Sequence, residues 1–77
     1  MVLLPFGTEE AHAVVVYDRN TKICVIVANS LEPLPDAVAT ARSLKADHVH
    51  IVAPPGAERY VMSIRVSEKS VAYELTI

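Results

Sequence analysis

Three histidines and one cysteine are the side chains of this 77-residue chain best suited to bind a metal ion. His48 and His50 are two residues apart, so a strand would place both on the same face. His12 is the third histidine, and Cys24 could lie near the pair on a neighbouring strand. Zinc sites use three or four such ligands in tetrahedral geometry. We therefore regard His48 and His50 as a candidate metal pair, with surface histidines at the start of a strand as the alternative. The sequence predicts no cofactor.

Asp18 together with Asp36, Glu58 or Glu74 could form the carboxylate pair of an acid–base catalyst. Asp18 is better explained as the first residue of a turn. Asp36 suits the positive end of a helix dipole, and Glu74 would pair with an arginine across a hairpin. These structural roles account for the carboxylates, so we predict no catalytic residue and no enzymatic activity.

A basic strip is expected near the C-terminus, where alternation places Arg59 and Arg65 on one face with Ser63 between them and Lys69 follows at a turn. Such a strip could lie along a phosphate backbone. Sheet proteins that read RNA usually also present stacking aromatic residues, but alternation places Tyr60 on the other face. Arg59, Arg65 and Lys69 are therefore a candidate nucleic-acid site, and the alternative is an ordinary solvated face.

The elements that must position these residues are centred on a strand–helix–strand unit. Apolar strands are predicted over 23–28 and 48–53, and a helix over 34–45. Pro35 suits the first helical turn, and the apolar residues repeat at helical spacing: Leu34, Val38, Ala41 and Leu44, with Ala37 as a further candidate. A connection of this length is a right-handed crossover, so the two strands should be parallel.

The remaining segments are expected to form two hairpins and an arm. Residues 11–28 form a hairpin whose turn is Asp18-Arg19-Asn20-Thr21, in which Asn tolerates the left-handed region. Residues 59–77 alternate between apolar and polar and predict a C-terminal hairpin. Residues 1–10 are an apolar arm that docks on the sheet or hangs free. The fold class is α+β, a single domain over 1–77 of order β-β-α-β-β-β. Its mixed, twisted five-stranded sheet carries one helix on one face.

The run from the first hairpin to the third strand, VVVYDRNTKICVIVANS followed by AVATARSLKADHVHIVAPP, resembles the core of restriction-endonuclease-like nucleases. That family carries an acidic residue near the first strand and a carboxylate-x-lysine motif at the end of the next. Asp18 matches the first position. The second position falls on Ala28-Asn29-Ser30, which has neither the carboxylate nor the lysine. The resemblance implies a nuclease-like scaffold without its metal site.

The first two predicted strands are apolar on both faces, which normally means that both faces are covered. One helix of about ten residues covers at most one face. We therefore expect a homo-oligomer, most simply a dimer, or a complex with another protein, with the N-terminal arm closing over the sheet as the alternative. The expected interface residues are Val14, Val16, Cys24 and Ile26.

Composition limits the remaining possibilities. The chain is 52% hydrophobic with a net charge of −2, which is not the basic excess typical of nucleic-acid binders. A single cysteine excludes a disulfide within the chain. The start resembles no signal peptide and no run is long enough to span a membrane, so a cytoplasmic location is expected. The absence of Gln hints at a thermophilic source.

These observations favour a small non-enzymatic module for protein interaction or assembly. The alternative is a nucleic-acid-associated protein that uses the basic strip. A weaker alternative is an inactive nuclease-like scaffold or a small metal binder.

Overall fold

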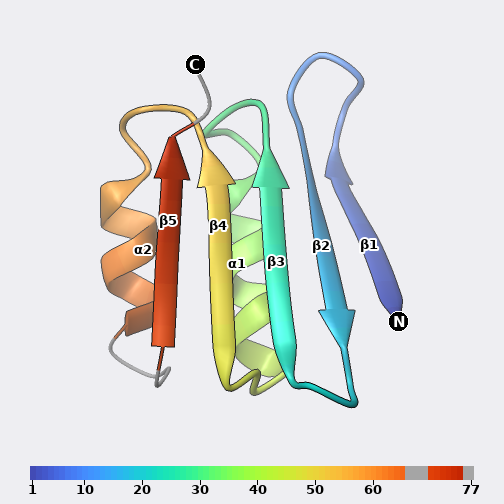
Figure 1. Cartoon of the computed structure of the whole chain (residues 1–77). Coiled ribbons are helices and arrows are strands. Elements are labelled where there is room, and N and C mark those ends of the chain that lie inside the picture. The colour runs from blue at the N-terminus through green and yellow to red at the C-terminus, as the bar shows by residue number, and fades with distance from the viewer. Residues whose placement is uncertain (66–69, 76–77) are drawn as a thin grey trace.

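The part of the chain that the structure describes forms a mixed five-stranded sheet with two helices (Figure 1). The computed structural model describes residues 1–65 and 70–75, with side chains for residues 1–60 and for Met62. The elements are β1 (Val2–Gly7), β2 (His12–Asp18), β3 (Ile23–Ala28), α1 (Leu34–Ser43), β4 (His48–Ala53), α2 (Glu58–Arg65) and β5 (Ser70–Leu75). The strands lie side by side in sequence order. β1, β2 and β3 are antiparallel neighbours, whereas β3, β4 and β5 are parallel.

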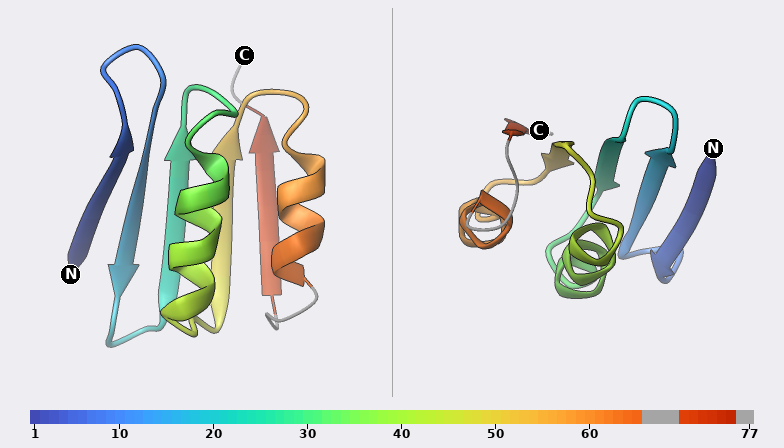
Figure 2. Two further views of the ribbon diagram at one scale, coloured as in Figure 1. Left: turned by 180° about the vertical axis from the view of Figure 1, so that it is seen from behind. Right: turned by 90° about the horizontal axis from the view of Figure 1, so that it is seen from below.

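Both helices lie on the same side of the sheet, as the view along the strands shows (Figure 2). Each helix connects two adjacent parallel strands, α1 between β3 and β4 and α2 between β4 and β5. Both connections step across the sheet in the same direction. Since such crossovers are right-handed, both helices must lie over the same face.

α1 confirms the predicted helix and its apolar stripe. Leu34, Ala37, Val38 and Ala41 are all buried, and Leu44 packs partly buried against them. The helix ends at Ser43, two residues before the predicted end, because Lys45 adopts a left-handed conformation with φ of 56°. The Lys45 N–H donates to the carbonyl of Arg42 at 3.2 Å, which closes the last turn.

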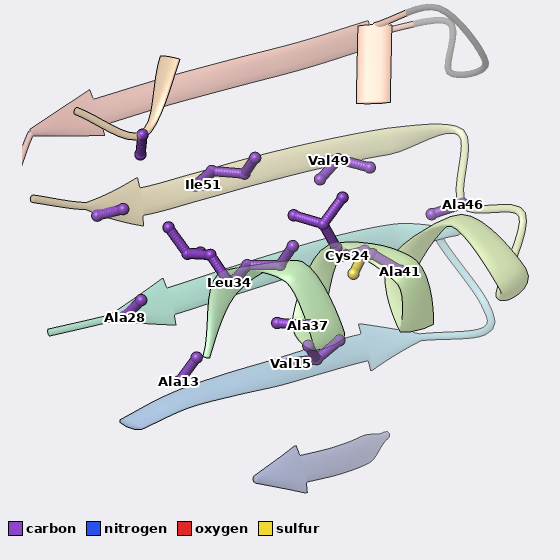
Figure 3. Packing of buried hydrophobic residues seen from close by; sticks show 14 of the residues in the cluster. Ala13, Val15, Cys24, Ala28, Leu34, Ala37, Ala41, Ala46, Val49 and Ile51 are labelled. Carbon is purple, nitrogen blue, oxygen red and sulfur yellow. The ribbon is translucent and has the colours of Figure 1, made fainter. Parts of the chain in front are cut away.

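The core lies between the helices and one face of the sheet (Figure 3). Side chains of α1 point at alternate residues of the three central strands. The strand residues in this core are Ala13, Val15 and Tyr17 of β2, Cys24, Ile26 and Ala28 of β3, and Val49, Ile51 and Ala53 of β4. Small residues on α1, mainly alanine, allow the helix to approach the sheet closely.

The predicted hairpin and the predicted parallel pair are both confirmed. β2 and β3 are antiparallel, and β3 and β4 are parallel on either side of α1. Asp18 begins the hairpin turn as expected, and its Oδ1 accepts the N–H of Asn20 at 2.9 Å. The left-handed residue, however, is Lys22 with φ of 58°. The turn is longer than the one predicted, and Lys22 donates its N–H to the Asp18 carbonyl at 2.8 Å.

The predicted C-terminal hairpin over 59–77 is wrong. Residues 58–65 form α2, and β5 runs parallel to β4. The segment carries two periodicities, because Ala57, Tyr60, Val61 and Ile64 also recur at helical spacing. Met62, which alternation assigned to an apolar face, is 60% exposed, and Ala57 is buried. A turn was predicted over 67–70, but Ser70 begins β5, and residues 66–69 lie outside the described residues.

The N-terminal arm is also a correction, because residues 2–7 form the edge strand β1 within the plane of the sheet. Four of the five predicted strands are therefore present, and β1 takes the place of the fifth. Gly7 ends β1 with φ of +86°, and a Cβ there would collide with the carbonyl oxygen of Ala11. Glycine is required at this turn.

Candidate functional site

The sheet face opposite the helices is the most distinctive surface of the described structure, and we call it the open face (Figure 1). Its residues alternate with the core residues along each strand. Several are strongly exposed for apolar side chains: Leu3 at 64%, Val27 at 44% and Ile23 at 41%. The open face consists of Leu3, Pro5, Val14, Val16, Ile23, Val25, Val27, His48, His50 and Val52.

Strand register joins these residues into one continuous surface. Leu3 pairs with Val16, Val16 with Val25, and Val25 with His50. A second row pairs Pro5 with Val14, Val14 with Val27, and Val27 with Val52. Paired residues project from the same face and lie within contact distance. The exposed side chains are therefore neighbours in a patch, not isolated surface residues.

The open face carries almost no charge over β1 to β4. These four strands contain no Lys, Arg or Glu, and Asp18 is their single acidic residue. Asp18 pairs with Ile23 at the end of the hairpin, so it lies at the rim of the open face. Charged residues are likewise depleted from the buried centres of protein interfaces. The surface has the composition of an interface centre.

The four residues expected at an interface lie on two different faces. Val14 and Val16 are half-buried on the open face, whereas Cys24 and Ile26 are fully buried in the core. The residues that share the surface with Val14 and Val16 are Ile23, Val25 and Val27. Alternation within each strand was evident from the sequence. It did not show which face of β2 matches which face of β3, because that depends on the hairpin register.

The candidate metal ligands are only partly brought together. His48 and His50 lie on the open face of β4, with His50 half-buried. Cys24 lies on the opposite face, and His12 begins β2 at the other end of the sheet. Among the described residues, no three His, Cys, Asp or Glu side chains are arranged to hold a metal ion.

The predicted basic strip does not lie on a strand. Arg59 belongs to α2, where its Nη2 donates to the Tyr60 hydroxyl at 2.9 Å and its guanidinium lies 4.8 Å from the centre of that ring. Arg65 ends α2, six residues later, so the two positions differ by about 120° around the helix axis. The side chain of Arg65 and all of Lys69 lie outside the described residues. The strand alternation that placed them on one face is wrong.

The carboxylates are separated as well. Asp36 and Glu58 begin the helices that follow the carboxyl ends of β3 and β4, whereas Asp18 lies at the opposite end of the sheet. The two positions that the resemblance to nucleases implies, at Asp18 and at Ala28-Asn29-Ser30, are also far from each other. Asp18 pairs with Ile23, and Ala28 ends the same strand about 17 Å away. The hairpin does not bring these positions to one site.

Comparison of the sequence with known families and curated proteins assigns this chain to no family. A scan of protein-family models finds no match to the chain, and a search of curated proteins finds no similar sequence. Among the described helices, none has the length and apolar character needed to cross a membrane.

Proposed function

We propose that this protein is a non-enzymatic interaction module whose working surface is the open face. The observation that carries the proposal is the exposure of a continuous apolar sheet face that no described helix or strand of the chain covers. Leu3, Ile23 and Val27 are the most exposed of its residues. Soluble monomers rarely expose contiguous apolar patches of more than a few hundred Å², and larger ones usually mark interaction sites.

The contrast with the rest of the surface supports this proposal. The exposed positions of α1 include Asp36, Arg42 and Ser43, which are typical of a solvated helix. On the open face, β1 to β4 present mainly apolar side chains, five of which are valine. A protein whose function required only solubility would place polar residues at these alternate strand positions, as sheets with one solvated face normally do.

The experiment compares the proteins retained from a cell extract by the immobilised chain and by charged variants. Val16→Lys and Val27→Lys place a cation on the open face. Met62→Lys is the matched control, because it replaces another exposed apolar side chain on α2, on the helix side of the sheet. Circular dichroism first verifies that each variant is folded.

We expect both open-face variants to lose specific retention while Met62→Lys retains it, because a desolvated ammonium group opposes apolar burial. Self-association counts as retention, with the tagged chain capturing an untagged copy. Retention that is equal for all four proteins would contradict the proposal.

A further inference from the structure

We infer that the occupant of the open face is a second copy of this chain, packed face to face as a two-fold dimer with β3 over β3. The inference rests on the proposed function and adds the identity of the partner and the arrangement of the two sheets. It follows from what the described part of the chain leaves uncovered, from the size of the face, and from its chemistry.

No described segment of the chain covers the open face. α1 and α2 both lie on the other side of the sheet (Figure 2). The N-terminal arm over 1–10 was the alternative cover for the sheet, but residues 2–7 of this arm form the edge strand β1 instead. Whatever covers the open face must therefore come from outside the described helices and strands.

The size of the face suits a dimer. The four strands that carry the open face, about 4.8 Å apart and about six residues long, give a surface of roughly 19 by 20 Å, or about 380 Å² before side-chain relief is added. Two such faces in contact bury about 760 Å² before this relief, and side-chain relief brings the buried area near the roughly 1,000 Å² of a specific interface. A short peptide would cover only part of this area.

The residues of the open face are suited to pack against the same face of a second copy. Five of its ten residues are valine, which gives much of the face a regular pleat of similar side chains: Val14, Val16, Val25, Val27 and Val52. Its described centre has no charge that would require a partner of opposite charge. Two pleated apolar faces interdigitate at about 10 Å, as in β-sandwiches. Homodimers with two-fold symmetry are the commonest assemblies of soluble proteins.

Pro5 directs association to the face rather than to the edge at β1. It lies in the middle of this edge strand, opposite Val14. Proline has no N–H to donate to an added strand, and prolines on edge strands commonly block such addition. Pairing of two β1 edges is therefore disfavoured, whereas the face remains open.

β3 is the central strand of the five. A two-fold axis that runs between the sheets and across the strands places each strand, β3 included, over its own copy. Val25 is the middle open-face residue of β3 and lies nearest this axis. A charge introduced at Val25 therefore meets the same charge on the second copy.

The test is a charge swap at Val25, measured by sedimentation velocity on the purified chain from micromolar to millimolar concentration. We expect the wild type to form dimers, and Val25→Lys and Val25→Asp each to dimerise at least 100-fold more weakly. An equimolar mixture of the two variants should dimerise at least tenfold more strongly than either variant alone, because the opposite charges then pair across the axis. Met62→Lys should dimerise like the wild type. Should a Val25 variant fail to fold, Val27→Lys, at the more exposed neighbouring position, replaces it.

Three results would overturn the inference: a wild-type monomer over the whole range, dimers that persist in both variants, or a mixture no stronger than its components. A wild-type monomer that still shows retention dependent on Val16 and Val27 would refute the second copy and leave the proposed function intact. Loss of both dimerisation and face-dependent retention would refute both.

Discussion

The two faces of this sheet are built from the same strands and from similar residues, yet only one of them forms a core. Ile26 is fully buried, whereas Ile23 on the same strand is 41% exposed. Val15 is buried and its neighbour Val14 is only half-buried. Residue type does not separate the two faces. What separates them is that both helices lie on one side.

This asymmetry follows from the order of the strands. A second helix would cover the open face only if one connection stepped backward across the sheet. In the order β3, β4, β5 both crossovers advance in the same direction, and their right-handedness places α1 and α2 together. The strands have the apolar pattern of a sheet whose two faces are both covered, but the described helices cover only one face.

The largest expected effect comes from placing the same charge on each face of β3. Ile26→Asp buries a carboxylate in the core at a cost that exceeds about 4 kcal/mol, so we expect an unfolded chain. Val27→Asp places the carboxylate on the open face, and we expect a folded monomer. Circular dichroism and light scattering measure the two outcomes. If both variants unfolded, or if both kept the wild-type mass, the result would contradict the claim that one face of β3 is core and the other an interaction surface.

A smaller effect is expected at Gly7, which positions a strand shared by both faces. β1 contributes Leu4 and Phe6 to the core side and Leu3 to the open face. Gly7→Ala should lower the free energy of unfolding by about 1–3 kcal/mol in urea titrations, because the added Cβ meets the Ala11 backbone at positive φ.

Gly56→Ala is the matched control for this variant. Its φ of +100° is also positive, but the new Cβ would meet only the end of the Leu31 side chain, at 3.1 Å. We expect a smaller loss there, since that side chain can move. A Gly7→Ala protein as stable as the wild type would show that the β1–β2 turn differs from the one described.

The smallest effect is expected at Asn29, which lies at the end of β3 and belongs to neither face. Its Oδ1 accepts the His12 N–H at 2.8 Å, and its Nδ2 donates to the Glu10 carbonyl at 3.1 Å. Asn29→Ala should cost about 1 kcal/mol in the same titrations, and Asn29→Asp, which keeps the acceptor, about half of that. Neither variant should change the solution mass. A change of mass would extend the interface to this loop.

Sequence patterns predicted the parts of the fold that local periodicity decides. The stripe from Leu34 to Ala41 identified α1, and the β-branched runs identified β2, β3 and β4. The same reasoning failed at residues 59–65, where periods of two and of about 3.6 coexist. It also treated the N-terminal residues as an arm, because Pro5 and Gly7 interrupt the run, although proline is compatible with an edge strand.

The candidate site was only half predictable. The excess of apolar residues on two-sided strands was evident, and two of the residues that it indicated, Val14 and Val16, lie on the open face. The assignment of Cys24 and Ile26 to the same surface needed the register of the hairpin, since a shift of one residue exchanges the two faces. His48 and His50 were correctly placed on one face, but the position of that face relative to Cys24 was not available from spacing.

By itself, then, the sequence determined the central strand–helix–strand unit, the β2–β3 hairpin and the presence of more apolar strand surface than one helix can cover. These features depend on neighbours along the chain, where side-chain period and turn residues act directly. Only the tertiary structure decided that β1 lies in the plane of the sheet, that α2 joins α1 on one side, and which valines share the open face. Those outcomes depend on strand pairing and crossover direction, which are set by contacts between residues distant in the sequence.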